Sequence, residues 1–153
     1  MRRLFLLTAV VTAALMVAGG TALAATLACN GGRCMGSNGP DTMFGSPGRD
    51  AIFSLKGGDL VRGDSGSDLI NGDGGDDKLL GGRGDDEVYG SDGGDIVAGN
   101  PGNDRLSGGT SSDRIEAVDG MRDVIACGKG PRDVAVYDRG IDRLRDCEIR
   151  QPR

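Results

Sequence analysis

Nine-residue units follow one another without a gap from residue 36 to residue 116. Each of the nine units has aspartate at its sixth position and a large aliphatic residue or Met at its eighth. Glycine stands at the first position in eight of the nine units, and at the fourth position also in eight. The sixth-position aspartates are Asp41, Asp50, Asp59, Asp68, Asp77, Asp86, Asp95, Asp104 and Asp113. A repeat this regular predicts a coil whose stacked turns bury one apolar side chain per unit.

The pattern GxxGxDxUx, in which U is apolar, resembles the repeat of the hemolysin-type calcium-binding (RTX) family. A single nine-residue match would be weak evidence for the family. Nine units in unbroken register are not expected to arise by chance. The resemblance implies an all-β fold, a right-handed parallel β-roll in which two short parallel sheets face each other. It also implies Ca²⁺ ions between the turns of repeats two apart, which pairs Asp41 with Asp59 and ends with Asp95 and Asp113.

Simple electrostatics also favours a cation between these aspartates. Alternate units stack on the same edge, so their carboxylates recur every ~4.8 Å and repel by about 1 kcal/mol per neighbour in water. Calcium accepts six to eight oxygen ligands in irregular geometry, whereas magnesium requires a tighter octahedron. For individual units, Asp and Gly acting only as turn formers remain an alternative.

The glycines at the first and fourth positions are predicted to supply positive φ angles. The second position is glycine only at Gly82 and Gly109, so the turn from residue 81 to residue 86 resembles the family most closely. Beyond residue 116 the register changes, because Asp113, Asp123 and Asp133 are ten residues apart. We expect the coil to continue there while losing its glycines and, with them, its ion sites.

Residues 1–24 have the pattern of a secretory signal peptide. Arg2 and Arg3 precede a 15-residue apolar run, and Ala22-Leu23-Ala24 resembles a cleavage site. The run is shorter than the ~20 residues of a membrane span, which makes an anchor the weaker alternative. We therefore expect a signal-peptide helix over 1–24, an N-terminal cap over 25–35, a nine-repeat roll over 36–116, and a degenerate coil with a C-terminal cap over 117–153.

Four cysteines flank the repeats, and an exported chain favours disulfides between them. With two units per turn, nine units separate the ends by about 20 Å, whereas bonded cysteines have Cα atoms within ~7 Å. Of the three possible connectivities, this distance favours Cys29–Cys34 with Cys127–Cys147. The same distance disfavours a zinc site built from all four cysteines.

Composition excludes several classes of function. Without Arg2 and Arg3, 16 basic residues face 23 acidic ones, which argues against a nucleic-acid partner and for cations. The chain has no His, so Gly63-Asp64-Ser65-Gly66 cannot belong to a serine-protease triad. Arg62-Gly63-Asp64 and Arg83-Gly84-Asp85 match an integrin-binding tripeptide but occupy different phases of the repeat. We expect no catalytic residues.

The sequence therefore predicts a secreted, non-enzymatic calcium-binding protein that folds when it binds calcium. It predicts no contact with the membrane after signal cleavage, and it does not identify a protein or envelope partner. The alternative is a structural or adhesive protein of the cell envelope, in which calcium only makes the scaffold rigid. An enzyme is the third hypothesis, and about 30 residues outside the roll-like region leave little room for a catalytic domain.

Overall fold

The computed structural model describes residues 24–153, and these residues form fifteen strands and no helix. The predicted signal peptide lies, apart from its last residue, outside the described residues. Glycine-rich turns separate strands of only three to six residues, because each nine-residue unit contains one short apolar stretch between turn-forming residues. No helix among the described residues has the length and apolar character needed to cross a bilayer.

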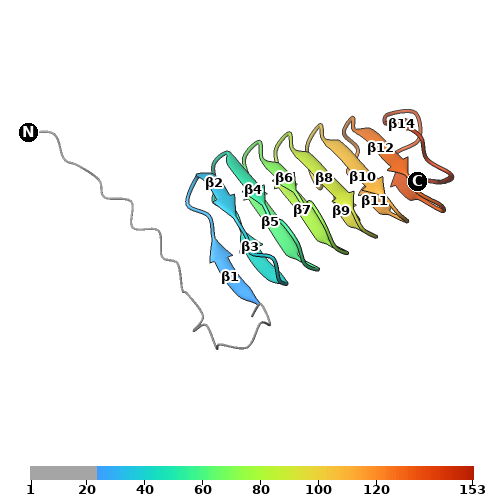
Figure 1. Cartoon of the computed structure of the whole chain (residues 1–153). Coiled ribbons are helices and arrows are strands. Elements are labelled where there is room, and N and C mark those ends of the chain that lie inside the picture. The colour runs from blue at the N-terminus through green and yellow to red at the C-terminus, as the bar shows by residue number, and fades with distance from the viewer. Residues whose placement is uncertain (1–23) are drawn as a thin grey trace, which may run out of the picture.

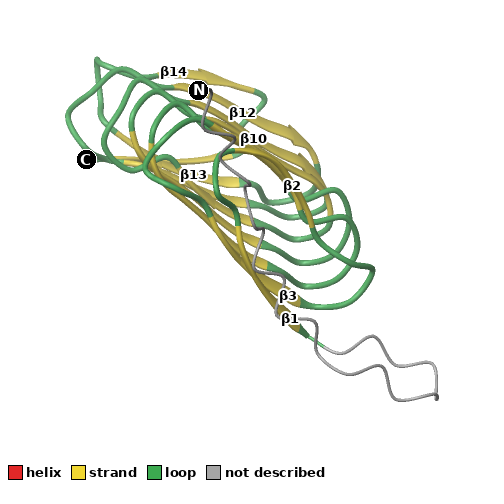
Figure 2. Ribbon diagram, turned by 90° about the vertical axis from the view of Figure 1, so that its left-hand side faces the viewer, coloured by secondary structure: helices red, strands yellow, loops and turns green. Residues whose placement is uncertain are grey.

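The strands alternate between two parallel sheets that form the two layers of a solenoid (Figure 1). The eight-stranded sheet contains, in spatial order, β1 (Ala25–Ala28), β3 (Asp41–Phe44), β5 (Leu60–Ser65), β7 (Lys78–Arg83), β9 (Ile96–Ala98), β11 (Arg114–Ala117), β13 (Val134–Tyr137) and β15 (Ile149–Pro152). The seven-stranded sheet contains β14 (Arg143–Arg145), β12 (Val124–Lys129), β10 (Arg105–Thr110), β8 (Glu87–Asp92), β6 (Leu69–Asn71), β4 (Asp50–Phe53) and β2 (Gly32–Met35). The turns between the layers line the two opposite edges of the molecule (Figure 2). The predicted two-sheet parallel β-roll is confirmed.

Two repeats make one turn of the coil, so a residue pairs with the residue 18 positions later. Leu60 of β5 pairs with Lys78 of β7, for example. The offset grows to 19 between Arg105 and Val124 and to 20 between Arg114 and Val134, because the C-terminal units are longer. The coil therefore absorbs extra residues in its turns and keeps its strands aligned.

The core is a stack of single side chains, one from each repeat. All nine eighth-position residues are 0–2 % exposed, and Ile125 and Ala135 extend the stack beyond the regular repeats. The buried residues of this stack are Met43, Ile52, Val61, Ile70, Leu79, Val88, Val97, Leu106, Ile115, Ile125 and Ala135. The two sheets thus enclose a core only two side chains deep, as the repeat pattern predicts.

Disulfides close both ends of this core. Cys29 bonds Cys34 with a Cα–Cα distance of 5.6 Å, and Cys127 bonds Cys147 with a Cα–Cα distance of 5.0 Å. Cys29, Cys127 and Cys147 are buried against the apolar stack. The pairing is the one that the sequence predicts.

Candidate metal centre

The sixth-position aspartates form two ladders, one along each edge of the coil. Each aspartate precedes or begins a strand, so units that enter the same sheet place their carboxylates above one another. Within a ladder, each backbone N–H donates to Oδ1 of the aspartate one turn later, at 2.7 to 3.0 Å. One ladder contains Asp41, Asp59, Asp77, Asp95, Asp113 and Asp133, and the other contains Asp50, Asp68, Asp86, Asp104, Asp123 and Asp142.

The second carboxylate oxygen of most ladder members has no hydrogen-bond donor. The eleven buried aspartates are 1–3 % exposed. Among the described residues, nine carboxylate oxygens are buried without a hydrogen-bond partner: Asp50 Oδ1 and the Oδ2 atoms of Asp59, Asp68, Asp77, Asp86, Asp95, Asp104, Asp113 and Asp133. A buried carboxylate oxygen without a partner is costly, so the ladders need positive charge or protons.

First-position glycines make room for these oxygens. A β-carbon on Gly81 would collide with Asp86 Oδ2 and would lie 2.8 Å from the carbonyl oxygen of Gly99 in the next turn. All eight first-position glycines would meet Oδ2 of their own unit's aspartate within 3.1 Å in the same way. Glycine at this position therefore keeps a carboxylate and, in most turns, a carbonyl oxygen close together.

Positive φ angles occur at the second and fourth positions of the repeat, not at the first. Leu55, Asp64 and Asp73 at the second position have φ of 78°, 77° and 62°, respectively. Gly66 and Gly84 at the fourth position have φ of 126° and 122°. The prediction of positive φ was correct for five of the eight fourth-position glycines, the exceptions being Gly39, Gly48 and Gly102. It was wrong for the first position, where a β-carbon would meet the unit's own aspartate and, in most turns, a carbonyl oxygen of the neighbouring turn.

Several aspartates in the middle of the ladders have raised pKa values. Burial raises the pKa of Asp68 to about 6 and the pKa of Asp77 to about 7, although one backbone N–H donor to each lowers it. Neighbouring carboxylates of the same ladder raise both pKa values further. Burial likewise raises the pKa of Asp86, Asp95 and Asp113 to about 6, and that of Asp104 to about 7. Nearby carboxylates add to the effect, and for Asp95 these are Asp76 and Asp92, outside the ladder. A bound cation would lower these pKa values, because it would favour the charged form of each carboxylate.

The oxygen atoms of the ladders are suitable ligands for a hard divalent cation. The ladders provide only oxygen atoms, from carboxylates and from nearby backbone carbonyls, and they provide no nitrogen or sulfur ligand. Calcium prefers such an oxygen-only set and accepts the irregular geometry of a turn. The unpaired oxygens and the glycine-lined spaces beside them therefore fit calcium.

The comparisons with known proteins agree with this geometry. The family model of the RTX calcium-binding nonapeptide repeat matches residues 35–61, 53–88 and 89–120, together more than half of the chain. The chain belongs to this RTX family. Its repeats imply calcium binding in a β-roll, a fold that is structural and generally not enzymatic. No curated protein matches the chain.

The structure of this RTX chain brings all nine predicted aspartates into the two ladders. It also adds Asp123 and Asp133, each 1 % exposed, and the half-buried Asp142 to the ladders beyond the regular repeats. The ten-residue spacing of Asp113, Asp123 and Asp133 is visible in the sequence, but the predicted ligands end at Asp113. The available signal was the apolar residue two positions after Asp123 and Asp133, Ile125 and Ala135, which keeps the order of the repeat.

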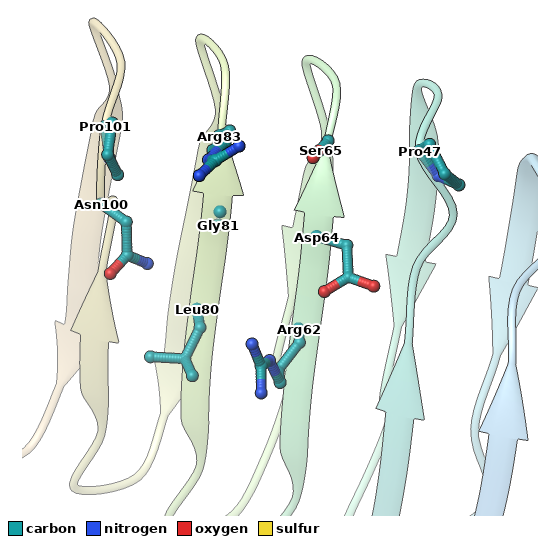
Figure 3. Close-up of a pocket in the computed structure, with 10 residues that line it drawn as sticks. Pro47, Arg62, Asp64, Ser65, Leu80, Gly81, Arg83, Asn100 and Pro101 are labelled. Atoms are coloured by element: carbon teal, nitrogen blue, oxygen red, sulfur yellow. The ribbon is translucent and has the colours of Figure 1, made fainter.

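A shallow groove of about 420 Å³ crosses the ends of four successive turns on one edge (Figure 3). Pro47, Asp64, Arg83 and Asn100 line it, one from each turn. The two integrin-like tripeptides differ in setting, because residues 62–64 lie within β5 whereas residues 83–85 leave the end of β7. This difference agrees with their origin in repeat composition.

Proposed function

We propose that this RTX chain is an exported, non-enzymatic protein that binds calcium between its stacked turns and folds as it binds. The observation that carries this proposal is the set of nine buried carboxylate oxygens without hydrogen-bond partners among the described residues. The nine sixth-position aspartates, from Asp41 to Asp113, would hold the ions, which would supply the positive charge that the ladders lack. Calcium-dependent folding follows because the same oxygens repel one another when no ion is present.

The apolar core supports this dependence on calcium. Each repeat buries one apolar side chain, whereas ordering each backbone residue costs ~1–2 kcal/mol. A ligand that binds only the folded chain stabilises that state by mass action. Calcium would therefore decide whether the repeats are folded.

Export is supported by the signal-peptide pattern of residues 1–24 and by the two disulfides. Disulfides persist in oxidising compartments, and the external medium also contains more free calcium than the cytosol. A chain with these properties would stay unfolded inside the cell and fold outside it.

Far-UV circular dichroism of the oxidised chain tests the proposal. We expect little strand signal in EGTA and a cooperative gain of strand when calcium is added in excess of the chelator. Magnesium at the same free concentration is the matched control and should produce a much smaller gain, because its octahedral preference suits the turns poorly. A fully folded spectrum in EGTA would contradict the proposed dependence on calcium, and a calorimetric titration would give the number of ions bound.

A further inference from the structure

Most of the acidic charge of this chain lies inside the coil, whereas its basic charge lies on the surface. Of the 23 acidic side chains in residues 24–153, eleven are buried in the ladders and seven are exposed. All 16 basic side chains of the same residues are exposed. Because calcium in the ladders would neutralise the buried carboxylates, the calcium-loaded roll would present a basic surface. The net charge of the sequence therefore has the opposite sign from the charge of the folded surface.

Apolar side chains are exposed on two turns near the C-terminal end of the coil. The turn between β11 and β12 carries Val118 and Met121, which are 47 % and 41 % exposed, and Val124 at the start of β12 is 45 % exposed. Ile141, in the turn between β13 and β14, is 41 % exposed. These are four of the seven large apolar side chains that are exposed in the described part of the chain. Apolar side chains gathered on a surface in this way indicate a binding partner.

The two turns lie against each other at the orange-to-red end of the coil (Figure 1). The backbone N–H groups of Asp119 and Gly120 in the first turn donate to Asp138 Oδ2 in the second, at 2.9 and 2.7 Å. Beyond the turns, Val124 of β12 pairs with Arg143 of β14 on the outer face of the seven-stranded sheet. The exposed apolar side chains therefore belong to one area that wraps around an edge of the coil.

Arginines are interspersed with these apolar side chains. Four exposed arginines follow from the same turns and from β14, and the last residue of the chain joins them, because its carbonyl oxygen accepts the N–H of Arg139 at 3.4 Å. Neither of the two salt bridges in residues 24–153 involves any of these five arginines. We call the area the C-terminal patch, and it comprises Val118, Met121, Arg122, Val124, Arg139, Ile141, Arg143, Arg145 and Arg153.

The carboxylates of the same turns are engaged by the backbone. Asp119 Oδ1 accepts the N–H of Met121 at 2.7 Å. Asp142 accepts the N–H of Asp123 on Oδ1 at 3.0 Å and the N–H of Asp138 on Oδ2 at 2.7 Å. Asp119, Asp138 and Asp142 are all half-buried, whereas the patch arginines are exposed. The outermost charges of the patch are therefore positive.

A hollow of about 270 Å³ adjoins the patch and is lined in part by its members Val118 and Arg153. Ala98 and Val136, which are 7 % and 4 % exposed, supply further apolar lining on the outer side of the eight-stranded sheet. The hollow thus places an apolar surface beside a positive charge. An amphiphile with an anionic head and an alkyl chain has the matching chemistry.

We infer that the C-terminal patch binds the surface of a membrane that contains anionic lipids, once calcium has folded the roll. Its arginines would contact lipid phosphates, and its aliphatic side chains would enter the boundary between headgroups and acyl chains. The sequence predicts no contact with the membrane after signal cleavage, whereas the assembled patch indicates the opposite. This inference rests on the proposed function, because the roll must fold for the two turns to meet.

Other partners fit the patch less well. A second copy of the chain that docks patch to patch would bring arginines against arginines, which repel. A nucleic acid or an acidic polysaccharide would pair with the arginines but would leave the aliphatic side chains without an apolar partner. The patch also contains no aromatic side chain on which bases could stack. An anionic lipid surface satisfies both kinds of side chain.

Vesicle co-sedimentation tests the inference with the exported form that begins at residue 25, which contains every strand of the roll. The signal peptide is left out because its basic and apolar residues would themselves bind lipid. In calcium, we expect binding to vesicles of phosphatidylcholine mixed with phosphatidylglycerol, and much weaker binding to phosphatidylcholine alone. EGTA should abolish binding, and added salt should weaken it.

Two triple variants separate the patch from general charge effects. Arg122→Gln with Arg139→Gln and Arg143→Gln should lower the partition coefficient roughly 100-fold, because each basic side chain near an anionic surface contributes about a factor of five. The control is Arg49→Gln with Arg62→Gln and Arg83→Gln, which removes the same charge from exposed positions outside the patch. Calcium bridges between exposed carboxylates and lipid would not distinguish the two variants.

A charge-neutral variant tests the apolar part of the patch. Met121→Gln with Ile141→Gln should lower the partition coefficient at least about 10-fold, because its side chains no longer favour the acyl boundary. Vesicle binding equal to that of the wild type would show that the arginines act alone. The patch would then be a site for a soluble polyanion, and the membrane assignment would be wrong.

Circular dichroism of each sample in calcium keeps the outcomes distinct. A folded wild-type chain that does not bind the anionic vesicles, or equal binding by the two arginine variants, would overturn the patch and leave the proposed function intact. A wild-type chain that does not fold in calcium would overturn both. If the patch arginine variant does not reach the wild-type spectrum, Arg145→Gln with Arg153→Gln replaces it, with an expected loss of roughly 30-fold.

Discussion

At the scale of single residues, the first position of the repeat shows how the backbone and the carboxylate share one small space. In eight of the nine units this residue is a glycine without positive φ, and Oδ2 of the unit's own aspartate lies within 3.1 Å of the place where a β-carbon would be. Ser54 is the exception. The second position shows the opposite case. Leu55 adopts φ of 78° although left-handed backbone costs a residue with a β-carbon about 1–2 kcal/mol. The fold therefore tolerates backbone strain at the second position more readily than added atoms at the first.

A pair of glycine substitutions tests this distinction. Gly81→Ala should raise the calcium concentration needed for folding and lower the free energy of unfolding by ~1–3 kcal/mol, because its β-carbon would collide with Asp86 Oδ2. Gly48→Ala is the control, since a β-carbon at Gly48 would meet no atom within 4 Å and its φ is not positive. Calcium titrations followed by circular dichroism measure both. Equal folding midpoints for the two variants would show that the first position does not shape the ion site.

At the scale of the strand, each element is too short to be stable alone. β6 (Leu69–Asn71) contributes a single core side chain, Ile70, which is 0 % exposed and has the neighbouring turns above and below it. Its parallel partners β4 and β8 provide the backbone hydrogen bonds. Stability is therefore shared between neighbouring turns, as expected for a solenoid.

Truncation of one core side chain should weaken several turns at once. We expect Ile70→Ala to lower the free energy of unfolding in saturating calcium by ~2–5 kcal/mol, because it leaves a cavity in a core that is only two side chains deep. Leu69→Ala, at the half-buried position next to it, should cost less than ~1 kcal/mol. Urea unfolding monitored by circular dichroism gives both values, and similar losses for the two variants would contradict the assignment of Ile70 to the core.

At the scale of the whole molecule, the two ladders link folding to every group that can neutralise a carboxylate. Calcium does so by coordination, and protons can do so as well, because the pKa values of Asp68, Asp77 and Asp104 are raised in the folded chain. Burial is the main cause of the raised pKa values, and the repulsion between stacked carboxylates adds to it. The disulfides at the two ends restrict the unfolded chain but do not change this balance.

Mild acid should therefore partly replace calcium. The pKa of Asp77 and of Asp104 rises from 3.8 to about 7 on folding, so the folded state binds more protons between these values. The stability that protonation provides to the calcium-free chain is greatest at and below pH 3.8 and is lost as pH rises through about 7. Circular dichroism in EGTA should show more strand at pH 5 than at pH 8.

Calcium affinity should be lower at pH 5 than at pH 8, because protons compete with calcium for the same carboxylate oxygens. Calorimetric titrations at the two pH values measure this effect. A calcium-free spectrum that does not change between pH 5 and pH 8 would show that the ladders do not control folding.

Much of the fold could be predicted because the repeat translates directly into space. In a coil of two nine-residue units per turn, Asp68 must lie one turn from Asp50 and one turn before Asp86, and Ile70 must face the interior between Ile52 and Val88. The cysteine pairing could be predicted from the length of the coil, which holds the two pairs of cysteines too far apart to bond across it. What failed was the reason for the first glycine, since the atoms that exclude a β-carbon there come from the folded turn and its neighbour.

The sequence by itself determined the two sheets, the stacked core and the positions of the nine aspartates, because an unbroken period leaves one arrangement in which every unit buries its apolar residue. Only the tertiary structure decided what happens after the period breaks. The path of the ten-residue unit places Asp119 beside Asp104, fifteen positions earlier, and beside Asp123. An inserted residue can bulge in several directions, and packing between turns selects the direction, so the spacing of the aspartates could not reveal this cluster.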